Sequence, residues 1–175
     1  MTSPQPGYRP CVGIMVLNRA GEVWLGRRHD APAEPEGPGA WWQMPQGGID
    51  ASEDPAKAAL RELHEETGIR SVRIIAESPA WYTYDLPAEL RPTAWGGRYR
   101  GQTQKWFAVR FTGSDDEVML VQPGHKPEFD AWCWAPIGEL PALVVPFKRQ
   151  VYQQVIRDFA SLARPDGGPA PSART

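Results

Sequence analysis

The sequence predicts a mixed α/β fold, in which helices pack on the faces of a mixed β-sheet. Seven strand-like runs outnumber two helical segments, and the two kinds of element follow one another in no regular alternation. A chain of 175 residues has the size of one domain and is long enough to bury a core. The expected strands are 11–18, 22–28, 41–44, 72–78, 81–86, 103–111 and 129–135, and the expected helices are 54–67 and about 147–163.

The first two expected strands form a hairpin. Residues 11–18 and 22–28 are joined by Arg19-Ala20-Gly21, a short glycine-containing connection that suits a tight turn. Residues 30–40 are rich in proline and glycine, which predicts an irregular surface loop. From Arg164 onward the composition is that of a disordered end. We therefore expect a flexible N-terminus at 1–6, one folded domain at 7–163 and a disordered tail at 164–175.

Capping residues and apolar spacing predict the two helices. Asp54 is a capping residue, Pro55 suits the first helical position, and Gly68 suits a left-handed stop. On this first helix four residues share a side that is expected to pack inward, namely Ala56, Leu60, Leu63 and Thr67. The second helix follows from apolar residues at helical spacing, which are Val151, Ile156, Phe159 and Leu162.

The composition argues against a membrane-bound or secreted protein. No run of about 18 apolar residues is present, and the first residues lack the basic start and apolar stretch of a secretory signal. Cys11 and Cys133 lie in apolar runs, so we expect two buried thiols rather than a disulfide framework or a four-ligand zinc site. These features predict a cytoplasmic protein. The net charge of −2 excludes bulk binding of polyanions.

Positive charge is concentrated between residues 90 and 114. This segment holds five basic residues and no acidic one, with four aromatic residues interleaved. Cations beside aromatic faces suit phosphates and bases. The alternative is a solvated strand pair whose aromatic rings belong to the core. The basic residues are Arg91, Arg98, Arg100, Lys105 and Arg110, and the aromatic ones that lie between them are Trp95, Tyr99, Trp106 and Phe107.

Three glutamates share one side of the helix predicted at 54–67. Glu62, Glu65 and Glu66 stand at positions i, i+3 and i+4, so their carboxylates fall within an arc of roughly 100°. Like-charged pairs at this spacing each cost about 0.2–0.5 kcal/mol, and the helix dipole disfavours negative charge near the C-terminus. A solvated acidic face is one interpretation. The other is a site for a divalent cation, and oxygen-only ligands describe magnesium or manganese.

The loop in front of this helix favours the metal site over the solvated face. Gly47 and Gly48 permit a close backbone approach to an ion or a phosphate. Glu53 lies in the same loop, where we expect it to pair with Arg61 and hold the loop against the helix. An ordinary surface ion pair is the alternative role of Arg61.

The loop and the helix together resemble a known motif. Gly47 is followed after five residues by Glu53, and after seven more by Arg61-Glu62-Leu63-His64-Glu65-Glu66-Thr67-Gly68-Ile69. This resembles the complete Nudix signature, G-x5-E-x7-R-E-U-x-E-E-x-G-U with U aliphatic, and all nine restricted positions are filled. The resemblance implies a Nudix α/β/α sandwich with a mixed β-sheet and a loop–helix–loop metal site. It also implies hydrolysis of a nucleoside diphosphate linked to another group.

Further segments resemble one bacterial branch of that family. The branch contains the RNA pyrophosphohydrolases and the related dinucleoside polyphosphate hydrolases of the invasion-associated type. The resemblance covers about residues 7–163, nearly the whole expected domain. It rests on residues 7–10, 42–48, 84–87, 101–107, 128–130 and 147–149.

The resemblance implies a set of metal ligands. Glu62, Glu65 and Glu66 are expected to hold divalent cations, Mg²⁺ or Mn²⁺, with the Gly47 carbonyl as a further ligand. Glu128, far along the chain, adds another carboxylate to the metals or acts as a base; the alternative is a solvated loop acid. The residues expected to support the motif structurally are Glu53, Arg61 and Gly68.

The resemblance also implies contacts to the substrate. Arg28 and Lys105 are expected to neutralise the polyphosphate, with help from Arg9. Phe147 is expected to stack on a base, and its alternative role is to pack against the core at the start of the second helix. No stable protein partner and no membrane are expected.

The reaction implied is in-line attack on a phosphorus of the polyphosphate by a water molecule that divalent ions activate. Glu62, Glu65 or Glu128 would accept the proton. The first expected function is removal of pyrophosphate from the 5′-triphosphate end of RNA, which initiates RNA decay. The second is cleavage of diadenosine tetra- or pentaphosphate to yield ATP. A non-catalytic Nudix-fold binding module is a third, and the presence of every glutamate of the motif argues against it.

Overall fold

The computed structural model describes residues 2–30 and 41–165, and within them eight strands form one mixed sheet. The strands follow the order β3-β2-β1-β7-β5, with β4 paired to β1, β6 to β7 and β8 to β2. Their bounds are β1 Arg9–Leu17, β2 Val23–Arg28, β3 Trp42–Gln43, β4 Gln46–Gly48, β5 Val72–Glu77, β6 Tyr82–Asp85, β7 Gly101–Phe111 and β8 Phe129–Ala135. The α-helices are α1 Pro55–Thr67, α2 Leu140–Leu143 and α3 Arg149–Phe159.

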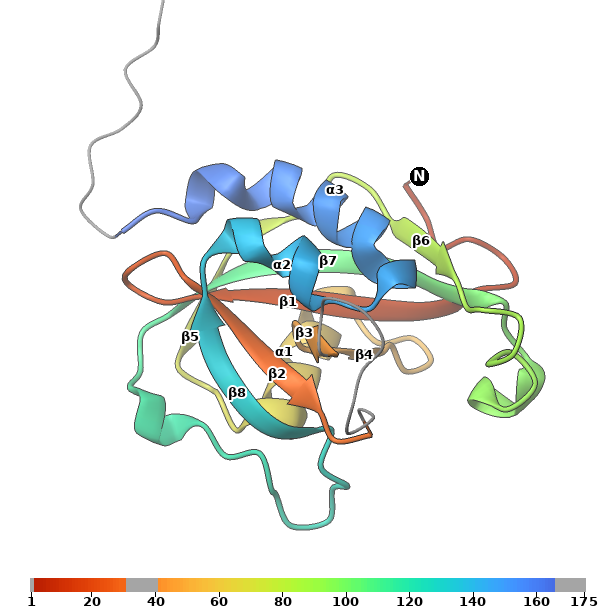
Figure 1. Cartoon of the computed structure of the whole chain (residues 1–175), viewed down its shortest axis with the longest axis horizontal. Helices are drawn as coiled ribbons and strands as arrows, with labels where there is room; N and C mark the ends of the chain where they lie inside the picture. The colour runs from red at the N-terminus through yellow and green to blue at the C-terminus, as the bar shows by residue number, and fades with distance from the viewer. Residues whose placement is uncertain (1, 31–40, 166–175) are drawn as a thin grey trace, which may run out of the picture.

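The parallel pair β1 and β7 forms the centre of the sheet. Nine residues of β1, from Arg9 to Leu17, are paired with β7 in continuous register. The strand β2 leaves β1 through the predicted hairpin turn but pairs with it only at Leu17 and Val23, then diverges and carries β8 with it (Figure 1). The short strand β4 pairs with the other end of β1, opposite residues 11–13. This divergence separates β2 and β8 from the part of β1 that β4 covers.

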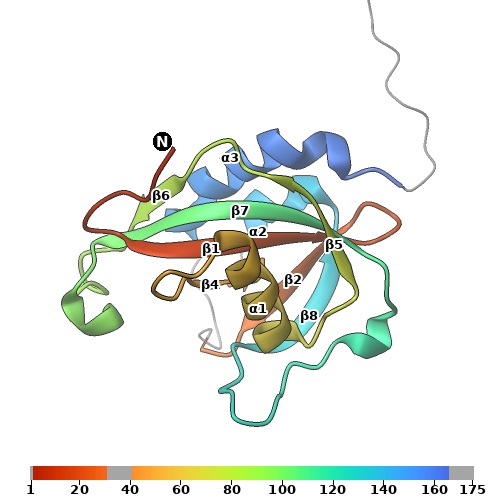
Figure 2. The ribbon, with the colours of Figure 1, turned by 180° about the vertical axis from the view of Figure 1, so that it is seen from behind.

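Helices cover both faces of the sheet, so the predicted α/β/α sandwich is confirmed. The helix α1 lies on the face seen in Figure 2, whereas α2 and α3 lie on the face seen in Figure 1. Alternate residues of β1 serve the two layers: Ile14 and Val16 pack in the cluster that contains α1, and Met15 packs in the cluster that contains α3. Because successive side chains of β1 point to opposite faces of the sheet, this central strand contributes to the cores on both faces.

The ends of α1 are as predicted, but its buried side is not. Asp54 accepts hydrogen bonds from the amides of residues 56 and 57, and Gly68 takes the left-handed conformation with φ 77°. The prediction that Leu60 faces inward is wrong, because its side chain is 40% exposed. The buried residues are Ala58, Ala59, Leu63 and Thr67. The inward side is thus rotated toward the side that bears Glu62 and Glu66.

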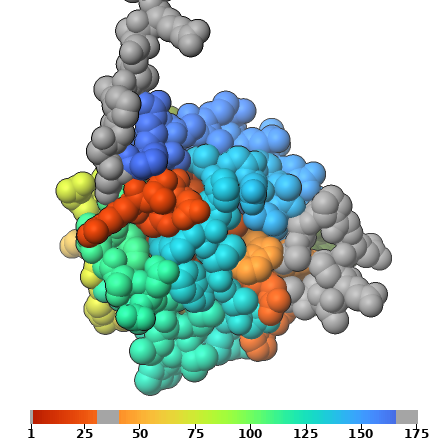
Figure 3. Space-filling model, turned by 60° about the vertical axis from the view of Figure 1, so that its left-hand side comes forward, coloured from red at the N-terminus to blue at the C-terminus, as the bar shows by residue number. Residues whose placement is uncertain are grey.

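The end of the described chain packs against the β1–β2 turn (Figure 3). A Cβ on Gly21, in that turn, would lie 2.8 Å from the backbone of residues 163 and 164. Arg110 donates to the carbonyls of Asn18 in the turn and of Leu162 near the end of the chain, at 2.8 and 3.0 Å. These contacts fix the C-terminal segment to the sheet.

Several other predictions can be compared with the structure. Cys11 is buried as expected, but Cys133 on β8 is only half-buried. The second predicted helix is shorter than 147–163, because 3-10 turns at 146–148 and 160–162 flank α3. The predicted loop 30–40 and the predicted tail lie almost wholly outside the described residues. No helix in the described part of the chain is long and apolar enough to cross a membrane.

Candidate active site

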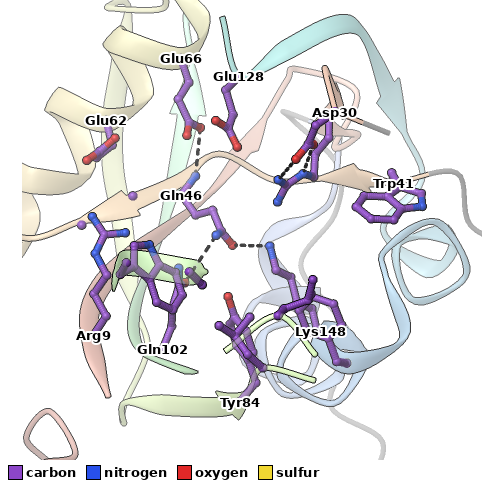
Figure 4. A pocket seen from close by; sticks show the side chains of 18 of the residues that line it. Arg9, Asp30, Trp41, Gln46, Glu62, Glu66, Tyr84, Gln102, Glu128 and Lys148 are labelled. Atoms are coloured by element: carbon purple, nitrogen blue, oxygen red, sulfur yellow. Dashed lines mark hydrogen bonds and ion pairs between the residues drawn. The ribbon is translucent and has the colours of Figure 1, made fainter. Parts of the chain in front are cut away.

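A cavity of about 530 Å³ lies between α1, the diverging strands and the segment before α3. Its lining combines four carboxylates with three cations and several aromatic rings. The view in Figure 4 shows Glu62 and Glu66 on α1 and Glu128 before β8 on one side, with Arg9, Tyr84 and Lys148 opposite them. Acidic and basic groups from distant parts of the sequence therefore face one another across one space.

Two of the three clustered glutamates point into the cavity, and their side chains are largely removed from solvent. Burial is the main cause that raises the pKa of Glu66 well above its usual value, and the negative charges of Glu128 and Glu62 raise it further. Burial also raises the pKa of Glu62, although the Arg61 guanidinium opposes this. Glu65 is farther out, with 31% of its side chain exposed. The carboxylates inside the cavity repel one another and are poorly hydrated.

Arg61 and Glu53 brace the loop against α1, as predicted. The Arg61 guanidinium donates to both oxygens of Glu53 at 2.8 Å and to the Gly48 carbonyl at 2.9 Å. Glu53 also accepts from the amide of Asp50 at 2.9 Å, and the pKa of Glu53 falls to about 2, chiefly because of Arg61. The same guanidinium reaches Glu62 at 3.0 Å. One arginine thus fixes both the loop and a carboxylate of the cavity.

Side chains of the protein lie close to the two glycines of the loop, and the expected approach of an ion or a phosphate to them stays a prediction. A Cβ on Gly47 would lie 1.9 Å from Cδ of Glu62. A Cβ on Gly48 would lie 2.3 Å from a guanidinium nitrogen of Arg9. A side chain at either position would therefore displace the end of the Glu62 or the Arg9 side chain from the edge of β4.

The donor chemistry of the cavity fits a hard divalent cation. Glu62, Glu66 and Glu128 offer carboxylate oxygens to the same space, and a cation there would relieve the repulsion that raises the pKa of Glu66. Within residues 2–30 and 41–165, however, no three His, Cys, Asp or Glu side chains converge as a ready-made metal site. The Arg61 guanidinium is instead paired with Glu62 at 3.0 Å and with Glu65 at 3.5 Å.

Two of the three predicted phosphate-binding residues line the cavity. Arg9 lies with its guanidinium carbon 5.4 Å from the centre of the Trp95 ring. Arg28 forms a two-point ion pair with Asp30, at 2.6 and 2.7 Å. Lys105 is not among the residues that line the cavity, and its ammonium donates to the Ser78 carbonyl at 2.5 Å instead. The phosphate-binding role expected of Lys105 stays a prediction.

Lys148 is a third cation of the cavity, and it was not singled out from the sequence. Its side chain is 3% exposed and donates to Oε1 of Gln43 at 2.9 Å and to Oε1 of Gln46 at 3.4 Å. Burial, with the positive charge of Arg28 nearby, lowers the pKa of Lys148 to about 7. The resemblance had included residues 147–149, but only the position of Phe147 was used.

Gln46 connects the acidic and basic sides of the cavity, a role that the sequence did not indicate. Its amide donates to Glu66 Oε2 at 3.1 Å, while its side chain contacts Gln102 at 3.4 Å and Lys148. Phe147 lines the cavity as expected and packs against the Tyr84 ring, with the two centres 5.7 Å apart. Its ring belongs both to the cavity wall and to the edge of the core, and its stacking on a base stays a prediction.

The segment from 90 to 114 divides between the two roles considered for it. Trp106 and Phe107 are buried in the core, as the structural alternative expected. Arg91 and Arg100 pair with Asp85, each at 3.2 Å. Trp95, in contrast, lines the cavity.

Comparisons with known proteins agree with this arrangement. The NUDIX domain model matches residues 7–155. The chain is 58% identical over 159 residues to the RNA pyrophosphohydrolase of Brucella abortus (strain 2308), covering 89% of each chain. It is 54% identical over 167 residues to the RNA pyrophosphohydrolase of Rhizobium meliloti (strain 1021), covering 94% of this chain and all of that one.

Solved structures share the fold at much lower sequence identity. The Escherichia coli dihydroneopterin triphosphate pyrophosphohydrolase superposes with a TM-score of 0.63 at 20% identity, over 86% of this chain and 98% of that one. A Caenorhabditis elegans Ap4A hydrolase complex gives a TM-score of 0.55 at 18% identity, over the same shares. With the complete signature on α1 and its loop, the family model across most of the domain and relatives of this identity, the chain belongs to the Nudix family.

Proposed function

We propose that this protein is a metal-dependent hydrolase that removes pyrophosphate from the 5′-triphosphate end of RNA. Two relatives at 54–58% identity carry the name RNA pyrophosphohydrolase, and both are matched over most of their length. The observation that carries the proposal is the cavity itself, where buried carboxylates of α1 face three cations. A 5′-triphosphate bridges two such sides when divalent ions neutralise the acidic one.

The cations bind and orient the phosphates in this proposal. Arg9 and Arg28 offer planar guanidinium groups, which suit phosphate oxygens, and Lys148 adds a compact charge deeper in the cavity. Asp30 holds the Arg28 guanidinium in one orientation. The arrangement fixes the polyphosphate along the floor of the cavity and points its phosphorus atoms toward α1.

The glutamates provide the metal ligands and the base. Glu62, Glu65, Glu66 and Glu128, with the Gly47 carbonyl, would hold Mg²⁺ or Mn²⁺, which supplies positive charge to the phosphate oxygens and makes water more acidic. Glu66 is held by the Gln46 amide, so it is oriented as a ligand rather than left free to move a proton. Glu62, Glu65 and Glu128 remain the candidates for the residue that accepts a proton from water.

Cleavage of dinucleoside polyphosphates is the second candidate function. Such a substrate carries a nucleoside at both ends of its phosphate chain. The cavity offers aromatic rings in two places, Phe147 beside Tyr84 and Trp95 beside Arg9. A non-catalytic role has no comparable support, because all the acidic residues of the signature are present.

A direct comparison of rates tests the proposal. The purified protein is incubated with Mg²⁺ and either 5′-triphosphorylated RNA or diadenosine tetra- and pentaphosphate, and the Glu66→Gln variant serves as the inactive control. We expect release of pyrophosphate from RNA, and loss of turnover in the variant without loss of fold. Full magnesium-dependent activity of the variant would refute the assigned site. A strong preference for the dinucleoside polyphosphates would replace the first function by the second.

A further inference from the structure

Asp85, the last residue of β6, lies at one end of the sheet, where three strands come together. It is paired with Gly101, the first residue of β7, and β1 begins beside them at Arg9, opposite Gln102 (Figure 1). Arg9 lines the cavity, and so does the segment that follows Asp85, through residues 86, 90 and 93–95. Asp85 itself does not line the cavity. It therefore connects two parts of the cavity wall from outside.

Both oxygens of the Asp85 carboxylate are engaged. Oδ1 accepts a hydrogen bond from the Tyr8 hydroxyl at 2.5 Å, and this bond is the main cause that keeps the pKa of Asp85 below its usual value. Oδ2 pairs with the guanidinium groups of Arg91 and Arg100, each at 3.2 Å. The guanidinium carbon of Arg100 also lies 5.5 Å from the centre of the Tyr8 ring. One carboxylate thus joins the start of the chain to two parts of the segment between β6 and β7.

Further hydrogen bonds hold the same segment in place. The Arg100 amide donates to the Gly7 carbonyl at 3.1 Å, and the Leu86 amide donates to the Arg100 carbonyl at 2.9 Å. The Arg91 guanidinium donates to the Leu86 carbonyl at 2.9 Å. These contacts bring together the two ends of the segment, which carries Trp95 between them.

The Arg9 side chain is not held by a carboxylate of its own. Within residues 2–30 and 41–165, Arg9 takes part in no ion pair, whereas Arg28 is oriented by Asp30. The Arg9 guanidinium carbon lies 5.4 Å from the centre of the Trp95 ring. The position of Arg9 therefore depends on the chain just before it and on the segment that carries Trp95, and Asp85 holds both.

We propose that Asp85 is a positioning residue, which acts through Tyr8 and the segment between β6 and β7 to hold Arg9 against the phosphates of the substrate. The side chains of Asp85, Arg91 and Arg100 are between 40% and 63% exposed, and exposed ion pairs add little to the stability of a fold. Their convergence on one carboxylate fixes geometry instead. The inference rests on the proposed function, in which Arg9 binds the triphosphate of the RNA.

Variants of Asp85 separate this role from a general effect on folding. Asp85→Asn keeps an acceptor for the Tyr8 hydroxyl but removes the charge that pairs with the two arginines, whereas Asp85→Ala removes both. Asp158→Asn and Asp158→Ala are the matched controls. Asp158 on α3 accepts a hydrogen bond from the hydroxyl of Tyr82, on the same strand β6, also at 2.5 Å, and does not line the cavity. Thermal melting of each variant verifies that it is folded.

Steady-state kinetics with Mg²⁺ and 5′-triphosphorylated RNA give the first readout. We expect Asp85→Ala to raise KM roughly 10-fold, the effect of one weakened charge-assisted contact, with kcat little changed. Asp85→Asn should lie between Asp85→Ala and the parent protein, and both Asp158 variants should keep the parent KM. In an Arg9→Met background, Asp85→Ala should raise KM by less than about 2-fold, because two residues that act on one contact are not additive.

Measurements without turnover give the second readout. The ligand is a 5′-triphosphorylated dinucleotide in which methylene groups replace both bridging oxygens of the triphosphate. Isothermal titration with Mg²⁺ should show a loss of affinity of roughly 10-fold in Asp85→Ala and none in Asp158→Ala. Hydrogen exchange of the protein alone should be faster at the amides of residues 86–100 in Asp85→Ala than in Asp158→Ala, because the segment opens more often.

The outcomes distinguish this role from the proposed function. Unchanged KM and affinity in Asp85→Ala, or an equal effect of this substitution with and without Arg9, would overturn the positioning role. If the parent protein binds the analogue but does not hydrolyse triphosphorylated RNA, the proposed function fails, and the affinities still decide the role of Asp85. A parent protein that neither binds the analogue nor hydrolyses RNA would contradict both.

Discussion

Gly47 shows how closely single residues are fitted in this cavity. An added methyl group at this position would lie 1.9 Å from Cδ and 2.1 Å from Oε2 of Glu62, so the carboxylate would have to move. Because misplacement of a reacting group by about 1 Å can cost about 100-fold in rate, we expect a loss of that order in kcat for Gly47→Ala. Circular dichroism should show an unchanged fold.

A second glycine provides the control for this substitution. A Cβ on Gly138 would meet nothing within 4 Å, and its φ is not positive, so Gly138→Ala should retain full activity. If Gly47→Ala is as active as Gly138→Ala, the position of Glu62 does not matter for the reaction.

Lys148 is expected to make substrate binding depend on pH near neutrality. Its pKa of about 7 means that the ammonium is protonated below this pH and largely neutral above it. A bound polyphosphate favours the protonated form, so KM for triphosphorylated RNA should rise as the pH increases from about 6 to 8. Lys148→Met should have a higher KM at pH 6 and a flatter dependence of KM on pH.

The exposed Lys57 on α1 is a suitable control for Lys148. Lys57→Met removes the same charge outside the cavity and should leave the pH dependence of KM as in the parent protein. An unchanged dependence in Lys148→Met would show that another group titrates.

At the scale of elements, the C-terminus of α1 is held by a segment distant in the sequence. The side-chain amide of Gln122 donates to the carbonyls of His64 and Glu65, and the Met119 amide donates to the Thr67 carbonyl at 2.7 Å. These donors satisfy the free carbonyls of the last turn. The same segment continues to Glu128, so it links the two acidic parts of the cavity.

Replacing the side-chain amide donor of Gln122 by a hydrogen-bond acceptor should therefore destabilise the protein. Gln122→Glu replaces the amide donors by a negative charge that faces backbone carbonyls and the negative end of the helix dipole. We expect the free energy of unfolding to fall by about 1–3 kcal/mol, as when buried polar groups lose their partners. Urea denaturation measures the free energy of unfolding. Gln153→Glu, on the exposed side of α3, is the matched control and should change this free energy little.

Most elements could be predicted because their signals are local. The cap and stop of α1, the glycine turn after β1 and the apolar runs of the strands all act within a few residues. The strand β4 was missed, since Gln46-Gly47-Gly48 has no strand-forming side chains and depends on its pairing with β1. Leu60 was misjudged because the buried side of α1 is centred on Ala59 and Leu63, nearer to the glutamates than the predicted side.

At the scale of the whole molecule, the residues by themselves predicted only the part of the site that one segment contains, whereas Arg9, Arg28, Glu128 and Phe147 were expected from the family resemblance. Glu53, Arg61 and the helix glutamates lie within 14 residues, so their spacing determines their geometry. Gln46, Lys148 and Trp95 reach the cavity from three different regions, and only the tertiary fold brings them together. The position of Lys105 also depends on the tertiary fold: in β7 it is paired with Val12, on the side of the sheet that faces α1, and it does not line the cavity.

Glu66 in the cavity and Glu53, which pairs with Arg61, should change the stability of the fold with pH in opposite directions. Glu53 has a pKa of about 2, below its unfolded value, so its pairing with Arg61 stabilises the fold above about pH 4.5 and is lost as the pH falls toward 2. Glu66 has a raised pKa, so the folded state holds a proton that the unfolded state releases. Its contribution therefore becomes less favourable as the pH rises above about 4.5.

Thermal melting over a range of pH, first without divalent ions, tests the direction of both pH-dependent contributions to stability. Glu66→Gln should raise Tm at pH 8, and the gain should shrink as the pH falls toward about 5, because the parent carboxyl is then protonated as well. Glu53→Gln should lower Tm at pH 7, with a difference that vanishes near pH 2. Mg²⁺ should raise Tm of the parent protein more than that of Glu66→Gln, since an ion that binds only the folded state stabilises it. Equal gains from Mg²⁺ in both proteins would show that the ion does not bind at Glu66.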